Sequence, residues 1–206
     1  VAKKELSELV DKTESLLKTF LPMSIVKELK IRQEMEIEET HEIADHFDCA
    51  SVLFTDMKGF TKYCSTIEPS ELVLFLNKMY QKFDRITNRT EMYKVEIIGD
   101  AYYCVSGVPS AQTDHAARAA YSALKMLEAI EEMKREGPKL KQADVKIRIG
   151  IHSDQVVAGV VGIKDPRYHL FGTTPQIANF MESEGVPSMV QCSKQTYDSL
   201  MNEANY

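Results

Sequence analysis

Residues 92–108 have the sequence MYKVEIIGDAYYCVSGV, and this stretch decides the fold. Two β-favouring runs, 92–98 and 101–108, flank the two-residue turn Gly99-Asp100. This pattern predicts a β-hairpin, because glycine readily adopts the positive φ that a tight hairpin turn needs. The hairpin would carry an acidic residue, Asp100, at its tip.

The segments on either side of the hairpin alternate between strand and helix patterns. Residues 50–56 form a short apolar run that predicts a central strand, and residues 69–85 carry apolar side chains at helical spacing. Residues 114–135 predict a second helix, and alternating isoleucines in 145–151 and a β-favouring run in 155–161 follow. The order is βαββαβ plus one extra strand. It predicts an α+β, ferredoxin-like (palm-like) domain, with two helices on one face of a mainly antiparallel sheet.

The second predicted helix has a plausible start and a plausible inner face. Asp114 is expected to be its N-cap, because an Asp side chain accepts hydrogen bonds from the first free N–H groups of a helix. The apolar positions expected to face the core are Ala117, Ala120, Leu124, Leu127 and Ile130.

Composition limits the class of protein. The 206 residues are 44% hydrophobic, which suits one globular domain, and 25 basic against 31 acidic residues give a net charge of −6. Without a basic run, a nucleic acid polymer is not expected as a partner. Four scattered cysteines indicate a reducing compartment, and no apolar run approaches the roughly 20 residues of a membrane span. We therefore expect a cytoplasmic location, either free or as the cytosolic part of a membrane-attached protein.

The N-terminal region differs in pattern from the rest. Apolar positions spaced three and four residues apart predict a short coiled coil or signalling helix over residues 1–26, and the alternative is an amphipathic helix lying on its own domain. Pro22 interrupts or restarts this helix. The Glu-rich segment 27–46 predicts a solvated connector, and residues 47–206 would form the functional domain. The heptad positions are Leu6, Leu9, Thr13, Leu16 and Phe20.

Two acidic residues stand where predicted strands end, Asp56 after the first strand and Asp100 at the hairpin tip. Neighbouring strands in this order would bring them together, and clustered carboxylates need a cation. Hard divalent ions prefer carboxylate and phosphate oxygens, and a pair of such ions can activate an attacking oxygen while stabilising the leaving one. An Asp in a turn is by itself more often a turn former.

Four ordered motifs strengthen the metal interpretation. FTDMKGFT (54–61), KVEIIGDAYY (94–103), RIGIHS (148–153) and PRYHLFG (166–172) together resemble the catalytic domain of class III adenylyl and guanylyl cyclases. In that family two domains pair head to tail, and the active sites lie in the cleft between them. One half supplies metals and the other the base pocket.

The resemblance assigns roles to several positions. Asp56, Asp100 and the carbonyl of Met57 would hold two Mg²⁺ or Mn²⁺ ions, which polarise the ribose 3′-hydroxyl for attack on the α-phosphate and release of pyrophosphate. Arg148 would contact the triphosphate; the alternative is an exposed strand residue paired with a surface acid. The backbone amides of the turn that would cradle the terminal phosphates belong to Gly59, Phe60 and Thr61.

The match to the family breaks in the segment TTPQIANFME (173–182). Complete halves have an Asn that orients the ribose and, four residues later, an Arg that stabilises the transition state; here Gln176 and Phe180 stand instead. Phenylalanine cannot donate to a developing negative charge, and the loss of one such donor costs about 3–4 kcal/mol. The departure resembles the metal-bearing halves: the alpha subunit of soluble guanylate cyclase and the first catalytic half of adenylyl cyclases.

Base preference rests on two positions. Glu96 resembles the guanine-reading Glu of guanylyl cyclases, although in a head-to-tail dimer it would face the nonproductive cleft, and alone it could equally be a cross-strand ion-pair residue. His169 matches neither the Cys of guanylyl nor the Asp of adenylyl enzymes. GTP is favoured over ATP.

The resemblance thus implies a GTP-using half that is weak or inactive as a homodimer and works with a complementary half under an upstream sensor. An ATP-using half and a non-catalytic regulatory pseudocyclase are the alternatives. A diguanylate cyclase is a remote third, since the Gly99-Asp100 turn lacks that family's motif. The chain also stops before the family segment that bears a phosphate-binding lysine.

Overall fold

The computed structural model describes residues 20–34, 43–137, 140, 142, 144–162 and 166–203. The chain divides into two compact units, one made of residues 1–46 and 157–171 and the other of residues 47–156 and 172–206. Two long strands, β1 and β4, run through both units.

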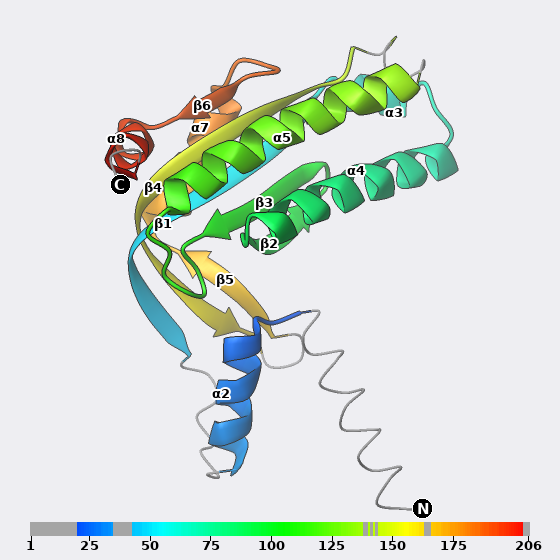
Figure 1. Ribbon diagram of the computed structural model, residues 1–206. Coiled ribbons are helices and arrows are strands. Elements are labelled where there is room, and N and C mark those ends of the chain that lie inside the picture. The colour runs from blue at the N-terminus through cyan, green and yellow to red at the C-terminus, as the bar shows by residue number, and fades with distance from the viewer. Residues whose placement is uncertain are drawn as a thin grey trace, which may run out of the picture. The chain divides into compact units, whose positions relative to one another are not determined.

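The larger unit contains most of the secondary structure (Figure 1). Its elements are β1 (Ala44–Lys58, from Phe47 on), α3 (Phe60–Cys64), α4 (Pro69–Arg89), β2 (Tyr93–Ile98), β3 (Ala101–Ser106), α5 (His115–Glu136), β4 (Lys146–Val161, up to Val156), α7 (Thr173–Ser183), β6 (Val190–Cys192) and α8 (Lys194–Glu203). The smaller unit holds α2 (Met23–Glu34), β5 (Arg167–Phe171) and the remaining parts of β1 and β4.

The described strands form one mainly antiparallel sheet with the order β2-β3-β1-β4-β5, and β6 pairs with β4 in parallel. The predicted hairpin is confirmed: β2 and β3 pair from Ile98 opposite Ala101, and Gly99 takes a φ of 64° in the turn. Strand β3 in turn pairs with β1, with Thr55 opposite Tyr102. The predicted α+β, ferredoxin-like class is therefore confirmed.

Helices α4 and α5 lie side by side and cover one face of this sheet (Figure 1). Pro69 occupies the start of α4, where its missing N–H costs nothing. Phe75, Met79 and Phe83 are buried on its inner side and pack with Ile147 and other residues of the sheet. The helix predicted over residues 69–85 is thus confirmed, and it buries one apolar side.

The predicted inner face of α5 is correct at Ile130, which is buried, and wrong at two other positions. Leu124, expected in the core, is 55% exposed, and Ala117 is exposed as well. The buried stripe lies about one residue away and is built largely from small side chains, which let the helix approach the sheet closely. It contains His115, Ala116, Ala119, Ser122, Ala123, Met126, Ala129, Ile130 and Met133.

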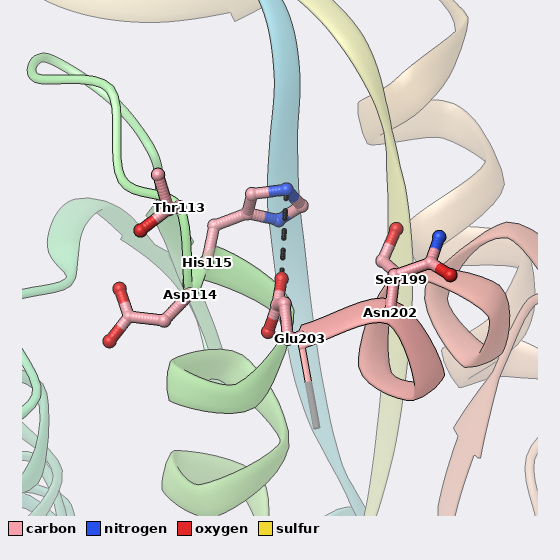
Figure 2. A pocket seen from close by; sticks show the side chains of 6 residues that line it. All are labelled: Thr113, Asp114, His115, Ser199, Asn202 and Glu203. Carbon is pink, nitrogen blue, oxygen red and sulfur yellow. Dashed lines mark ion pairs between the residues drawn. The ribbon is translucent and has the colours of Figure 1, made fainter. Parts of the chain in front are cut away.

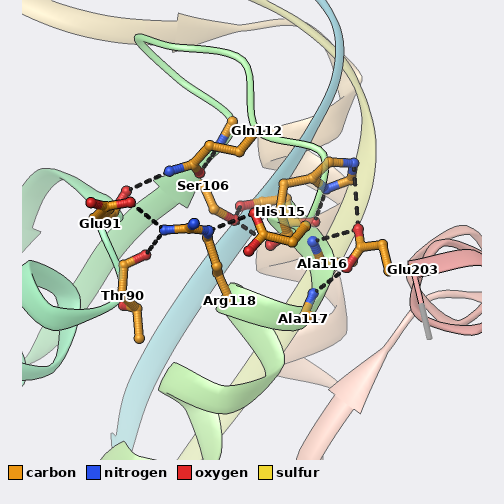
Figure 3. A network of polar contacts seen from close by, with 12 residues as sticks. Thr90, Glu91, Ser106, Gln112, His115, Ala116, Ala117, Arg118 and Glu203 are labelled. Atoms are coloured by element: carbon orange, nitrogen blue, oxygen red, sulfur yellow. Dashed lines mark hydrogen bonds and ion pairs between the residues drawn. The ribbon is translucent and has the colours of Figure 1, made fainter. Parts of the chain in front are cut away.

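The N-cap of α5 also differs from the prediction. Asp114 stands at the N-cap position, but its side chain makes no cap hydrogen bond and instead accepts from Arg118 at 2.7 Å. The free N–H groups of Ala116 and Ala117 donate to the carboxylate of Glu203 at 3.0 and 2.7 Å (Figure 3). A residue from the far end of the chain therefore caps this helix.

Residues 145–161 were expected to contain two strands, but the structure has one continuous strand, β4. The expected break falls at Ser153, which is buried. Its hydroxyl bonds to those of Ser51, at 2.6 Å, and Thr196, at 3.0 Å, so a polar residue is accommodated inside the strand. The alternation of buried isoleucines at 147, 149 and 151 is confirmed.

The smaller unit has its own packing. Leu21, Ile25 and Val26 are buried, and the N–H of Val160 donates to the carbonyl of Ile43 at 2.9 Å. Helix α2 starts directly after Pro22 and crosses the predicted division at residue 26, so residues 27–34 of the predicted connector are helical. Most of the predicted heptad seam, from Leu6 to Leu16, lies outside the described residues.

Candidate active site

Of the two aspartates predicted to hold metal, Asp56 lies on β1 and Asp100 lies in the hairpin turn directly before β3, the strand next to β1. Thr55 pairs with Tyr102, so the same antiparallel register places Met57 opposite Asp100. The backbone of Met57 accordingly hydrogen-bonds to the carboxylate of Asp100. Partial burial, followed by the negative charge of Asp56, raises the pKa of Asp100. The sequence prediction that strand order brings the two carboxylates together is consistent with this electrostatic coupling.

Arg148 lies next to this pair and makes two hydrogen bonds and one further ion pair. Its Nη2 donates to Oδ2 of Asp56 at 2.7 Å, and its Nη1 donates to the carbonyl of Ser183 at 2.9 Å. Its Nε is 2.9 Å from Oε1 of Glu182, an ion pair whose angle falls outside hydrogen-bond geometry. One guanidinium therefore connects the end of β1 with the end of α7.

Glu182 is buried, with 5% of its surface exposed, and no sequence motif singled it out. Burial, followed by the charge of Asp56, raises its pKa to about 7. A signal did exist, because Thr174, Ala178 and Glu182 recur every fourth residue, and this is the buried side of α7. A carboxylate on an otherwise small and uncharged helix face indicates a specific partner.

Gly150 determines where α7 sits. A Cβ atom at this position would come within 2.1 Å of the Glu182 nitrogen and 2.4 Å of the Ala178 oxygen, both backbone atoms. Only glycine allows this approach of helix to strand. Arg148, two residues earlier on the same face of β4, is thereby placed beside the end of α7.

The turn between β1 and α3 contains the residues predicted to bind the terminal phosphates. Gly59 adopts the left-handed region with a φ of 86°, and its carbonyl accepts from the N–H of Tyr63 at 2.9 Å. Phe60 and Thr61 are the first residues of α3, so their N–H groups belong to the free donors at a helix start. Across the site, the hydroxyl of Tyr80 donates to the carbonyl of Gly99 at 2.6 Å and holds the hairpin turn.

The donor set at this site suits hard divalent cations. Asp56 and Asp100 are only partly exposed, and burial, followed by the negative charge of Asp56, raises the pKa of Asp100. Arg148 already supplies one compensating positive charge. Oxygen ligands of this kind bind Mg²⁺ together with substrate phosphates rather than in a closed protein cage. The described ranges contain no closed cluster of three or more acidic, His or Cys side chains that could hold a metal ion.

The positions expected to complete catalysis lie on the other side of α7. Gln176 and Phe180 are both exposed, Phe180 by 57%, and four residues apart they share one helix face. Glu182 belongs to the buried side. Helix α7 therefore separates the two degenerate positions from the ion-pair network of the aspartates.

The two predicted base-reading positions belong to different compact units. Glu96 lies on β2, next to an irregularity in the β2–β3 pairing between Lys94 and Glu96, and is half-buried. His169 lies on β5 and pairs in register with Gly159 of β4.

A second polar centre lies at the start of α5. A pocket of about 610 Å³ is lined by Thr113, Asp114, His115, Ser199, Asn202 and Glu203 (Figure 2). Its acidic groups already have partners, since Asp114 bonds to Arg118 and Glu203 caps α5 and lies 3.8 Å from Nε2 of His115. None of these side chains belongs to the aspartate site, and we assign the centre a structural role.

Behind this pocket runs a buried chain of hydroxyls and histidines. Nδ1 of His115 bonds to Ser51 at 2.7 Å, and Ser51 leads through Ser153 and Thr196 towards Ser193, which bonds to Nδ1 of His152 at 2.7 Å. Burial lowers the pKa of both histidines. They act as neutral core residues.

The fold is a ferredoxin-like, palm-like domain, and two carboxylates and one guanidinium lie together at the ends of its strands. The family described as the adenylate and guanylate cyclase catalytic domain matches residues 42–206. The chain belongs to this family.

Several individual proteins are similar to the chain. The receptor-type guanylate cyclase gcy-28 of Caenorhabditis elegans is 41% identical over 95% of this chain and 15% of its own length. The soluble guanylate cyclase subunit beta-2 of Rattus norvegicus is 42% identical over 93% of this chain and 27% of its own length. The chain thus spans under a third of these relatives, which include soluble and receptor-type proteins. None of the described helices is long and apolar enough to cross a membrane.

Solved structures agree with this assignment. The guanylate cyclase domain of RhGC from Catenaria anguillulae, in complex with GTP, has a TM-score of 0.69 at 35% identity, over 76% of this chain and 84% of that one. The adenylyl cyclase CyaB from P. aeruginosa, with a TM-score of 0.71 at 20% identity, shares the fold.

Proposed function

We propose that this chain is the metal-carrying half of a dimeric guanylyl cyclase, which converts GTP to cyclic GMP and pyrophosphate with a complementary half. The observation that carries the proposal is the arrangement of Asp56, Asp100 and Arg148, in which two coupled carboxylates and one guanidinium meet at the end of two strands. The curated relatives described above are guanylate cyclases, which favours GTP over ATP.

Each group has a defined task in this proposal. Asp56 and Asp100, with the carbonyl of Met57, hold two Mg²⁺ or Mn²⁺ ions, which supply Lewis-acid activation of the 3′-hydroxyl and charge stabilisation at the α-phosphate. Arg148 orients the triphosphate by charge-assisted hydrogen bonds. The N–H groups that bind the terminal phosphates come from Gly59, Phe60 and Thr61.

The same chain lacks the groups that complete the reaction. Phe180 has no donor for the developing negative charge, and Gln176 stands at the ribose-orienting position. A partner must therefore supply an Asn and an Arg from its own helix, and a homodimer should be weak or inactive. We further propose that residues 1–26 transmit a signal from an upstream sensor; register-breaking insertions between residues 20 and 27 that leave regulation unchanged would reject this.

A reconstitution experiment tests the main proposal. This domain is mixed with a cyclase half that carries the Asn and Arg, and cyclic nucleotide formation from GTP or ATP is measured with Mn²⁺. We expect activity with GTP on mixing and little with either half alone. Asp56→Asn should abolish this gain in activity. Asparagine has nearly the same shape as aspartate but lacks the negative charge that the proposed metal ions need. No gain on mixing would contradict the proposal.

The internal ion pair favours one alternative. Arg148 holds Asp56 at 2.7 Å and could keep that carboxylate from a metal ion, as in a regulatory pseudocyclase. In that case Asp56→Asn would leave the activity of the mixture unchanged. A third outcome, product from ATP and none from GTP, would identify an adenylyl cyclase half.

A further inference from the structure

We infer that Glu182 is a positioning residue, which holds Arg148 ready to release Asp56 when a metal-bound triphosphate arrives. This inference rests on the proposed function. It assigns a role to a residue outside the metal and phosphate positions, and its effect is exerted entirely through Arg148.

The contacts of Arg148 divide into two sets. One contact, from Nη2, goes to Asp56, a proposed metal ligand. The other two, from Nε and Nη1, go to Glu182 and to the carbonyl of Ser183, at the end of α7. Guanidinium is planar, so these two anchors determine the direction of the third nitrogen. Arg148 can thus lose Asp56 and keep its place.

The anchor itself is rigid. The backbone of Glu182 packs directly on Gly150, because a single added Cβ would come within 2.1 Å of the Glu182 nitrogen. The side chain is 7% exposed and has little room for other conformations. Positions of groups that bind substrate must be held within fractions of an ångström, and a well-packed helix end provides this.

The charges explain why a carboxylate is needed. Folding alone gives little reason for a buried ion pair, since apolar residues of similar size often serve as well or better. Without the negative charge of Glu182, the remaining acidic partner of Arg148 is Asp56, and the arginine competes more strongly with a metal ion for that carboxylate. The negative charge of Glu182 thus offsets part of the positive charge of Arg148, so the arginine competes less with a metal ion for the carboxylate of Asp56.

The test measures metal binding rather than turnover. Binding of Mn²⁺ is followed by electron paramagnetic resonance in the presence of 3′-deoxy-GTP, which lacks the attacking hydroxyl. We expect Glu182→Gln to raise the half-saturating Mn²⁺ concentration roughly tenfold, in the range found for partners of metal ligands. Glu182→Asp, which keeps the charge, should recover part of the affinity.

A second background separates action through Arg148 from other causes. In Arg148→Met, adding Glu182→Gln should change the half-saturating concentration less than about twofold, because the arginine that Glu182 positions is gone. An equal tenfold effect in both backgrounds would show that Glu182 attracts the metal directly and would overturn the inference. A lower unfolding midpoint with unchanged Mn²⁺ binding would show a structural role and would overturn it too.

Failure of the proposed function gives a different result. If Asp56→Asn binds Mn²⁺ as the wild type does, the metal site itself is wrongly assigned. If Asp56→Asn loses binding and Glu182→Gln does not, only the role of Glu182 is refuted. If Glu182→Gln does not fold, Glu182→Asp is tested instead, in the wild type and in the Arg148→Met background. The half-saturating Mn²⁺ concentration should then rise by less than about tenfold in the wild type and stay unchanged in Arg148→Met.

Discussion

Replacing Gly150 with alanine should disturb both stability and the site. The new Cβ would lie 2.1 Å from the nitrogen of Glu182, 2.4 Å from the oxygen of Ala178 and 2.7 Å from the Cα of Glu182. All three atoms belong to the backbone of α7, so no side-chain rotation relieves the overlap. Ordinary contact begins at 3.4 Å, and the helix must therefore move by roughly 1 Å.

The expected magnitude follows from this displacement. Overpacking of a well-packed interior typically costs about 1–3 kcal/mol, and a clash with backbone belongs at the upper end, so we expect the free energy of unfolding to fall by about 3 kcal/mol. The shift also moves Glu182 away from Arg148. A misplacement of about 1 Å can lower the rate of a positioned reaction roughly a hundredfold, which we expect for cyclic GMP formation with a complementary half.

Urea denaturation followed by circular dichroism measures the first effect, and the reconstituted cyclase assay measures the second. Gly137→Ala is the matched control: its Cβ would lie 3.3 Å from the oxygen of Met133 and 3.7 Å from the Cβ of Leu140, so the change should stay within about 1 kcal/mol. A Gly150→Ala protein as stable and active as the wild type would refute the close packing of α7 on β4.

Three further changes have defined outcomes. Glu203→Ala removes the acceptor for two N–H groups at the start of α5 and should lower the free energy of unfolding by about 1–2 kcal/mol in urea denaturation; an unchanged midpoint would contradict the capping role. Burial lowers the pKa of His152 below 6.5, so protons bind first to the unfolded chain. The stability advantage of the wild type over His152→Asn should therefore shrink as the pH falls through and below 6.5, and an advantage that grows on acidification would refute this. Combined Gln176→Asn and Phe180→Arg should raise cyclic GMP formation by the chain alone at least about 100-fold, and no gain would argue against the division of labour.

Local sequence signals predicted the elements whose causes are local. The hairpin followed from Gly99, whose positive φ suits the turn, and the buried isoleucines of β4 followed from their period of two. The proximity of Asp56 and Asp100 needed only the order of the strands. Their proposed chemistry, however, came from the family motifs, because two aspartates at strand ends occur in many proteins.

Features with distant causes could not be predicted. Two apolar stripes run along α5, and the sequence alone did not show that the alanine-rich stripe packs inward while Leu124 remains exposed. The sequence divided β4 into two runs because the hydroxyl partners that let Ser153 lie buried inside the strand, Ser51 and Thr196, are far away in the sequence. Glu182 lies on a helical stripe that the sequence does show, but its partner Arg148 lies 34 positions earlier, so the ion pair itself could not be predicted.

The capping of α5 by Glu203 also bears on how this domain is cut for expression. A fragment that ends at Asn202 would still contain every proposed metal and phosphate ligand, yet the first turn of α5 would lose its acceptor and His115 its acidic neighbour (Figure 3). Low activity in such a fragment would report a loosened helix rather than a missing catalytic group. Boundaries chosen from the active-site motifs alone would therefore confuse instability with inactivity.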